Sequence, residues 1–260
     1  MLRPRIVPAL LIDDGDLVKT TRFADPRYIG DPINAVRIYN DKEVDELIVL
    51  DIGATRNGRE PDIDLISRLA AECQMPLCYG GGVRTVEQVE NIVSRGVEKV
   101  ALSSAIFEMP SLVKRASEQV GGQSVVAVLD VFQKGLNKPY ELRTHNSHHR
   151  QKIDIRTCCF ELEQAGVGEI VVNVIHKDGE MNGYDLDLAS LLYACTSVPV
   201  TMLGGAGSLE DIATFTQKFP QFAAAAGSLF VYKGALRAVL INYPNHGQRE
   251  NIARAAGLSI

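Results

Sequence analysis

The sequence of 260 residues contains no tryptophan, few cysteines and fewer basic than acidic side chains. The 27 lysines and arginines against 32 aspartates and glutamates give a formal net charge of −5. A nucleic-acid-binding protein that contacts the phosphate backbone through an overall positive charge is therefore disfavoured. The sequence also lacks an apolar run of the roughly 20 residues that a membrane-spanning helix needs. Residues 1–5 carry no signal-peptide pattern, so we expect a cytoplasmic protein that binds neither nucleic acid nor membrane.

The five cysteines form neither a metal-binding pattern nor a disulfide framework. Cys73, Cys78 and Cys195 are isolated, and Cys158 and Cys159 are adjacent. We therefore expect reduced thiols packed in the interior, with no metal and no cofactor.

Apolar, β-branched runs alternate with amphipathic segments along the whole chain. Apolar runs of four to eight residues are typical of strands that are buried on both faces. Thr85 and Ser208 stand where helices should begin, each two residues before an acidic side chain. Eight strand–helix units in about 250 residues predict an α/β fold, the (β/α)8 TIM barrel, rather than an open doubly wound sheet. The expected strands are 5–12, 46–52, 76–79, 99–103, 124–131, 169–175, 199–203 and 222–226.

The sequence repeats itself at an offset of 123 residues. The segment 44–52 resembles the segment 167–175, and the same offset aligns the glycines at 81–82 with those at 204–205. A repeat of this length is about half of a barrel, which predicts two duplicated (βα)4 half-barrels.

Residues 1–243 are expected to form this single barrel domain. The tail, residues 244–260, has no counterpart in the repeat. It is either a helix on the barrel or a frayed end, and the sequence leaves its role open.

Equivalent glycine-rich turns follow the third and the seventh predicted strands. Glycine lets backbone N–H groups converge on an anion, and the ends of strands seven and eight are the usual phosphate position of this fold. The duplication copies this arrangement onto strands three and four, so we expect two phosphate sites across one barrel mouth. The alternative is that the glycines only make tight turns. The expected phosphate-binding residues are Gly81, Gly82, Ser103 and Ser104 in the first half and Gly204, Gly205, Gly227 and Ser228 in the second.

Polar side chains stand where other predicted strands end. Asp130 follows a run of apolar residues, and a carboxylate there is either a general acid/base or a helix cap; we expect catalysis. Asp51 and Asn173 lie at equivalent strand ends, Asp178 lies in the loop after the sixth strand, and Lys19 follows the first.

Two polar segments lie near this end of the predicted barrel. The loop 20–31 contains few apolar residues that could pack it against the barrel, and we expect it to close over a ligand. His145, His148 and His149 cluster in a polar stretch. Metal binding is the alternative, but we expect a solvated hairpin tip.

Four charged residues begin apolar strands: Arg5, Glu46, Lys99 and Glu169. If these side chains point into the barrel, they form a ring of two positive and two negative charges that neutralises itself, as buried charges require. Taken alone, four solvent-facing charges are the simpler interpretation.

From Met1 to about Asn242, the sequence resembles HisF, the cyclase subunit of imidazole glycerol phosphate synthase. The resemblance is specific because related duplicated barrels share only some of its motifs. These motifs are Asp14-Gly15 with Val18-Lys19, Gly30-Asp31-Pro32, Asp45-Glu46-Leu47, Gly80-Gly81-Gly82, Asp130, Asp178-Gly179 with Gly183-Tyr184-Asp185, and Gly204-Gly205-Ala206-Gly207.

The resemblance implies a phosphorylated small-molecule substrate, the two-phosphate ribonucleotide PRFAR, which the family converts to imidazole glycerol phosphate and AICAR. It also implies a glutaminase partner of the HisH type on the N-terminal face of the barrel, and ammonia that passes through the barrel. The family's ammonia gate then matches Arg5, Glu46, Lys99 and Glu169. Its substrate-lining positions match or adjoin Lys19, Asp51, Gly82, Ser104, Asn173, Asp178, Gly205 and Ser228.

The sequence departs from the family at one catalytic position. The family uses two strand-end aspartates as an acid/base pair; Asp130 is present, but Leu11 occupies the first-strand position. Loss of one member should reduce the rate by the ~10²–10⁴-fold that general acid–base catalysis provides. Asp13 points to the same face as Leu11, about 7 Å further out, and is the one candidate substitute. The polar residues at Ser103 and Asn173 also differ from the family's.

These observations leave two main hypotheses. The first is a HisF-like synthase subunit that uses ammonia from a glutaminase. The second is a repurposed or catalytically impaired HisF paralogue. It would activate a glutaminase and channel ammonia to a third enzyme, an amidotransferase of amidino-sugar surface polysaccharide (LPS) biosynthesis. A stand-alone sugar isomerase of the sister barrel family ranks last, because it gives no reason for Glu46 and Lys99.

Overall fold

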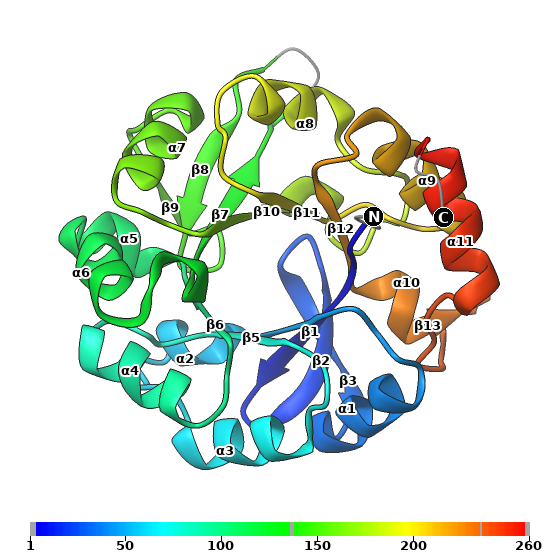
Figure 1. Cartoon of the computed structure of the whole chain (residues 1–260), viewed down its shortest axis with the longest axis horizontal. Helices are drawn as coiled ribbons and strands as arrows, with labels where there is room; N and C mark the ends of the chain where they lie inside the picture. Colours follow the sequence, from blue (N-terminus) through cyan, green and yellow to red (C-terminus); the bar gives the residue numbers. More distant parts are fainter. Residues whose placement is uncertain (1–3, 136–137, 235, 258–260) are drawn as a thin grey trace.

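The chain forms a closed parallel barrel surrounded by helices (Figure 1). This computed structural model describes residues 4–135, 138–234 and 236–257. Within them, eight parallel strands pair in chain order, and β7 pairs with β10 across the junction of the two halves. The predicted TIM barrel is confirmed, whereas the duplicated origin of its halves stays a prediction. The barrel strands are β1 (Ile6–Asp13), β4 (Leu47–Asp51), β5 (Leu77–Gly80), β6 (Lys99–Leu102), β7 (Val125–Phe132), β10 (Glu169–Val174), β11 (Val200–Leu203) and β12 (Ala223–Ala226).

Helices connect successive strands and cover the outside of the barrel. Several begin at a residue whose side chain accepts a backbone N–H, and Thr85 and Ser208 form full capping boxes with Gln88 and Asp211. Each such cap stabilises its helix by about 1 kcal/mol. None of the helices in the described residues is both long and apolar enough to cross a membrane. The helices are α1 (Pro32–Asp41), α2 (Ile52–Arg56), α3 (Ile63–Glu72), α4 (Val86–Ser94), α5 (Ser104–Glu108), α6 (Ser111–Val120), α7 (Ile155–Gln164), α8 (Leu186–Tyr193), α9 (Leu209–Lys218), α10 (Ser228–Val231) and α11 (His246–Ala255), with 3₁₀ turns η1 (Gly122–Ser124) and η2 (Ile175–Lys177).

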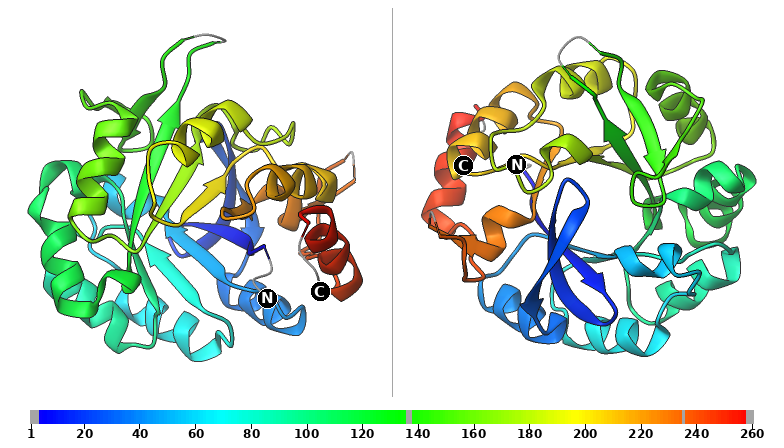
Figure 2. Two further views of the ribbon diagram at one scale, coloured as in Figure 1. Left: turned by 45° about the horizontal axis from the view of Figure 1, so that its top comes forward. Right: turned by 180° about the vertical axis from the view of Figure 1, so that it is seen from behind.

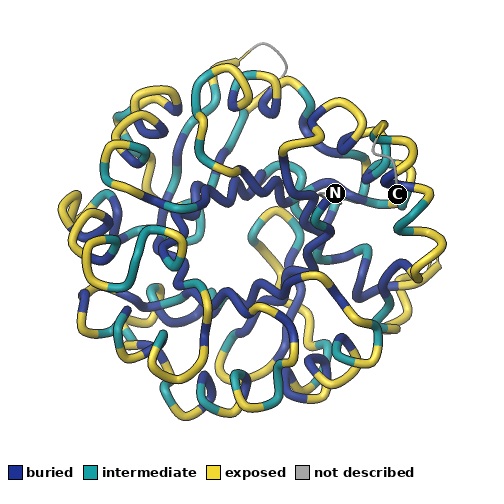
Figure 3. Tube along the Cα trace, in the orientation of Figure 1, coloured by how far each residue is buried: buried dark blue, intermediate teal, exposed yellow. Residues whose placement is uncertain are grey.

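The strands separate two apolar layers. Figure 3 shows the strands as an almost continuous buried ring, with exposed residues on the outer surfaces of the helices. The larger core lies between strands and helices, while a second cluster fills the inside of the barrel. Small and β-branched side chains make up most of this inner cluster, and none of its members is aromatic. Its members are Val7, Ala9, Ile48, Cys78, Ala101, Val126, Val128, Val171, Leu203, Ala223 and Ala225.

The segment predicted as a loop over residues 20–31 is instead an antiparallel hairpin, so that expectation was wrong. Its strands are β2 (Asp16–Thr21) and β3 (Ala24–Gly30), and β2 also pairs with β1. The pairing satisfies backbone polar groups of the hairpin, and Leu17 and Ile29 pack against the hydrophobic core. Figure 2 shows this hairpin, in blue, lying across the end of the barrel seen from behind.

A second hairpin extends β7 beyond the barrel through β8 (Glu141–Thr144) and β9 (His149–Arg150). The hairpin predicted around the three histidines is therefore present. His148 and His149 are exposed, as a solvated tip requires, but His145 is half-buried.

The C-terminal part of the chain returns along the outside of the barrel. After a short hairpin, β13 (Tyr232–Lys233) and β14 (Ala238–Val239), the helix α11 packs against α9. Of the two alternatives for the tail, the described residues show the helix on the barrel. All five cysteines are free, and three of them are buried.

Candidate functional site

A cavity opens at the carboxyl ends of the barrel strands. Its non-protein space is about 1260 Å³, part of it open to solvent. The expected substrate-binding residues from both halves of the chain, together with Asp130, line this cavity: Lys19, Asp51, Gly81, Gly82, Ser103, Ser104, Asn173, Asp178, Gly204, Gly205, Gly227 and Ser228. The structure thus brings together side chains up to about 200 residues apart in the sequence.

The glycine turns of the two halves approach neighbouring backbone closely. A Cβ on Gly81, whose φ is 130°, would lie 2.5 Å from the carbonyl oxygen of Asp51. A Cβ on Gly205, whose φ is 102°, would overlap the carbonyl oxygen of Gly183. Larger residues would therefore push the Gly81 turn away from the end of β4 and the Gly205 turn away from the loop that carries Gly183. Glycine at these positions allows the turn to pack tightly, and it also leaves room for a ligand.

The second-half site combines a buried ammonium group with a helix start. Lys19 is 4% exposed, and its Nζ donates to the carbonyl of Ala9 at 3.3 Å. A Cβ on Gly227 would overlap this Nζ, so the glycine makes room for the lysine. Burial lowers the pKa of Lys19, and the charge of Asp178 opposes that shift. At the start of α10, the amide of Ser228 precedes the first intrahelical hydrogen bond, so it remains available to an anion.

The first-half site contains three cavity-lining residues that the sequence analysis missed: Arg84, Glu108 and His145. The backbone N–H of His145 donates to Ser104 Oγ at 3.4 Å, and its Nε2 lies 3.3 Å from Glu108 Oε1. Two of these residues had a readable signal. Arg84 closely follows the Gly82 turn, and Glu108 lies one helical turn after Ser104, on the same face of α5.

His145 lies in the tip turn of the hairpin, as expected, but it is half-buried and lines the cavity instead of being fully solvated. Residues 145–147 all have positive φ, which folds the turn back over the barrel mouth. The neighbouring Asn146 donates through Nδ2 to the carbonyl of Ile52 at 3.3 Å, on the far side of this half-site. In the described part of the chain, no group of three His, Cys, Asp or Glu residues is arranged to hold a metal ion.

Asp130 lies at the end of β7 between the two half-sites. Its Oδ1 accepts a hydrogen bond from Asn173 Nδ2 at 3.3 Å, across the pairing of β7 with β10. Burial raises the pKa of Asp130 to about 7, although hydrogen bonds from Asn173 and Ser103 oppose the rise. Near neutral pH, this carboxyl group can therefore both donate and accept a proton, which is what a general acid/base requires.

The first strand does not supply a second carboxyl group beside Asp130. Leu11 lines the cavity and is 7% exposed. Asp13 is absent from the described residues that line the cavity, and both its carboxylate oxygens accept from Arg56 Nη2, at 3.0 and 2.8 Å. The structure therefore does not bring Asp13 together with Asp130, because the ion pair holds it at the rim.

Asp51 and Asp178 each have structural partners. Asp51 caps α2, accepting from the amides of Gly53 and Ala54 at 2.9 Å each, and burial raises its pKa. Asp178 Oδ2 accepts from the Thr20 hydroxyl at 2.7 Å and from the Phe23 amide at 3.2 Å. Asp178 thus anchors the β2–β3 hairpin at the cavity.

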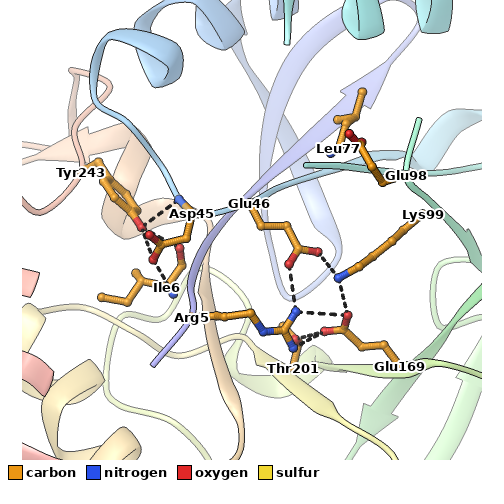
Figure 4. Close-up of polar contacts among 10 residues, drawn as sticks. All are labelled: Arg5, Ile6, Asp45, Glu46, Leu77, Glu98, Lys99, Glu169, Thr201 and Tyr243. Carbon is orange, nitrogen blue, oxygen red and sulfur yellow. Dashed lines mark hydrogen bonds and ion pairs between the residues drawn. The ribbon is translucent and has the colours of Figure 1, made fainter. Parts of the chain in front are cut away.

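At the opposite end of the barrel, the four charged strand starts meet in a closed ring (Figure 4). Arg5 lies 2.9 Å from Glu46 and 2.9 Å from Glu169. Lys99 Nζ lies 2.6 Å from Glu46 and 2.7 Å from Glu169. The Thr201 hydroxyl also donates to Glu169. Each glutamate contacts both cations, so the ring carries no net charge.

The ion pairs of the ring shift the pKa values of Arg5, Lys99 and Glu169 toward their charged forms. Burial alone would lower the pKa values of Arg5 and Lys99, but the two glutamates outweigh it and raise both. Burial likewise opposes ionisation of Glu169, but Arg5 and Lys99 outweigh it and lower the pKa of Glu169. The side chains of the glutamates are only 6% exposed, so the attraction is weakly screened.

Comparison with known proteins gives consistent matches over nearly the whole chain. The family model described as "Histidine biosynthesis protein" matches residues 5–237. "Putative imidazole glycerol phosphate synthase subunit hisF3" of Vibrio vulnificus is 50% identical over 250 residues, 96% of each chain. "Putative imidazole glycerol phosphate synthase subunit hisF2" of Pseudomonas aeruginosa is 46% identical over 245 residues, 94% of this chain and 97% of that protein. "Imidazole glycerol phosphate synthase subunit HisF" of Lactococcus lactis is 35% identical over 232 residues, 89% of this chain and 90% of that protein.

Proposed function

Because the chain belongs to the histidine biosynthesis protein family, and within it to the HisF subunits, we propose that it is the synthase subunit of a cytoplasmic, glutamine-dependent complex. Its substrate is a small molecule with a phosphate at each end, of the PRFAR type. The observation that carries this proposal is the pair of equivalent half-sites that face one cavity, with Asp130 between them.

Each half-site offers the groups that a phosphate needs. In the second half, the ammonium group of Lys19 lies against Gly227, and the hydroxyl and amide of Ser228 and the turn at Gly205 line the same cavity. In the first half, Arg84 supplies the positive charge and Ser104 the hydroxyl. Because the net charge of the chain is −5, these local cations provide the attraction that a global positive field does not.

Asp130 is the acid/base of the proposed reaction. Its raised pKa allows proton transfer in both directions at neutral pH, and its place between the half-sites puts it beside the middle of a two-phosphate ligand. Leu11 predicts a slow reaction, because no matching carboxylate lies on the first strand.

We further propose that a glutaminase of the HisH type docks on the face that carries the charged ring. Ammonia then enters the barrel through the ring formed by Arg5, Glu46, Lys99 and Glu169. The support is physical: the ring places paired charges with no net charge at this end of the barrel, and small side chains such as Ala9 and Ala225 line the barrel above it.

The experiment is an assay of the purified chain with ammonium ions and PRFAR. We expect imidazole glycerol phosphate and AICAR in equal amounts, and loss of both in Asp130→Asn. Absence of both products at every enzyme concentration would rule out the histidine-pathway reaction.

A second function is favoured by Leu11 and by the engagement of Asp13 with Arg56. In this alternative, the chain activates the glutaminase and passes ammonia to a third enzyme, such as an amidotransferase of amidino-sugar surface polysaccharides. Glutaminase stimulation that survives Asp130→Asn but disappears in Lys99→Ala, without imidazole product, supports this alternative. Stimulation that needs Asp130 but not Lys99 contradicts it.

A further inference from the structure

The C-terminal segment is hydrogen-bonded to the strands that carry the ring. The Tyr243 hydroxyl lies 2.8 Å from the carbonyl oxygen of Ile6 and 3.0 Å from Asp45 Oδ2. Asp45 Oδ2 also accepts from the amide of Ile6 at 3.3 Å. Figure 4 shows these three residues beside the ring. We call this group, Ile6, Asp45 and Tyr243, the clamp.

The clamp joins the immediate neighbours of two ring residues. Ile6 follows Arg5, and Asp45 precedes Glu46. The parallel ladder between β1 and β4 begins only at Ala9 and Ile48, further into the barrel. At the level of the ring, the clamp and the Arg5–Glu46 ion pair therefore join these two strands in place of ladder hydrogen bonds. The clamp thus links the backbone next to Arg5 to the residue next to Glu46.

Helix α11 closes the clamp from outside. Arg249 Nη1 donates to Asp45 Oδ1 at 3.3 Å and to the carbonyl of Glu43 at 2.9 Å, and its side chain is 12% exposed. The guanidinium carbon lies 5.6 Å from the centre of the Tyr243 ring. Both oxygens of Asp45 are thereby fixed by donors from the C-terminal segment. The Tyr243 ring is itself packed against Phe230, with centroids 5.4 Å apart.

We propose that Tyr243 and Arg249 are positioning residues for the ring. By fixing Asp45, they hold Glu46 against Arg5 in the geometry that a docked glutaminase meets. The tail that has no counterpart in the internal repeat thus couples partner docking to the state of the ring. This inference rests on the proposed function for the role of the ring, but the positioning itself does not depend on it.

The first test uses the whole chain alone. Tyr243→Phe keeps the ring packing and removes the hydroxyl, and Arg249→Met keeps most of the apolar stem and removes the charge. We expect hydrogen exchange of the Ile6 amide, measured by NMR, to accelerate at least about tenfold in Tyr243→Phe, because Asp45 Oδ2, which accepts from that amide, loses its contact with the Tyr243 hydroxyl. The Ile170 amide, which donates to Pro199 on another strand, is the internal reference and should change less than twofold.

The second test uses the complex with a HisH-type glutaminase. We expect both variants to lower stimulation of glutamine turnover at saturating chain about three- to tenfold, with the dissociation constant of the complex within twofold of wild type. A merely structural or docking role would change the affinity instead. Arg254→Met is the matched control on α11, since Arg254 is 65% exposed and pairs only with Glu250 on its own helix among the described residues.

Two outcomes overturn the inference. If the hydrogen-exchange rate of the Ile6 amide in Tyr243→Phe stays within twofold of the wild-type rate, positioning by the clamp is refuted. Equal losses of stimulation in Arg249→Met and Arg254→Met refute coupling through Asp45. A wild-type chain that does not stimulate the glutaminase contradicts the proposed function instead, and the exchange result then decides the positioning role on its own.

Discussion

Removal of Lys99 is the sharpest perturbation of the charged ring. Lys99→Met leaves Glu46 and Glu169, each 6% exposed, with Arg5 as their only remaining partner in the ring. Breaking a buried ion pair from one side costs about 3–5 kcal/mol. Because Lys99 is 19% exposed, we expect the lower end, about 3 kcal/mol of the free energy of unfolding. For a chain of this size, that corresponds to a fall in Tm of roughly 6–12 °C.

The effect of Lys99→Met on the free energy of unfolding should depend on pH in a defined direction. In the wild type, the lowered pKa of Glu169 contributes stability that is present above its ordinary pKa and is lost as the pH falls through the folded-state value. In Lys99→Met, a proton on Glu169 relieves the uncompensated charge. The difference in stability between wild type and variant should therefore shrink as the pH falls from 7 to 4.

Urea unfolding followed by circular dichroism at several pH values measures both effects. Lys114→Met is the control, because Lys114 forms an exposed pair with Glu118 and should change stability by less than about 0.5 kcal/mol. Adding Glu46→Gln to Lys99→Met restores a neutral ring and should regain most of the loss. If Lys99→Met were no less stable than Lys114→Met at pH 7, the reasoning about a self-neutralising buried ring would be refuted.

Three further predictions concern the cavity. Asp130→Asn should stabilise the chain at pH 8 but not at pH 4. The reason is that a carboxyl group with a raised pKa loses its contribution to stability as the pH rises through about 7. Urea unfolding midpoints of wild type and variant that do not diverge between pH 4 and pH 8 would contradict this prediction. Gly227→Ala should displace Lys19 and weaken binding of PRFAR at least about tenfold in calorimetry, whereas unchanged affinity would place the phosphate elsewhere. Leu11→Asp should raise imidazole product formation from ammonium ions about 10²-fold or more; a variant no faster than its parent would contradict the proposed role of a paired acid/base.

The barrel was predictable from local sequence because its strands and helices obey simple periodicities. Continuous apolar runs such as the one that precedes Asp130 predict buried parallel strands, and the cap residues Thr85 and Ser208 predict helix starts. The glycine turns and polar strand ends then fall at one mouth because parallel strands share their direction.

The two hairpins over the mouth were less predictable for a physical reason. Their turns place non-glycine residues such as Arg22, Phe23 and His145 at positive φ, without the Asn-Gly or Asp-Gly pairs that mark tight hairpins. Contacts distant in sequence hold them instead: Asp178 fixes the first hairpin, and the carbonyl of Ile52 fixes the second.

For the tail and the ring, too, the sequence predicts the local structure but not the long-range contacts. Asn245 and Gln248 form a capping box, a signal that would have predicted α11 from sequence alone. Its attachment through Arg249 to Asp45 depends on how the chain returns to the first strands, and no local pattern shows it. Likewise, only the closed barrel determines that Arg5 and Lys99 point inward.

The most direct test of the central claim is the rate of glutamine hydrolysis by a HisH-type glutaminase, titrated with this chain. We expect stimulation that saturates at one chain per glutaminase and is lost when Lys99→Ala replaces the wild type. A rate that stays at the value of the glutaminase alone, at every concentration of wild-type chain, would contradict it.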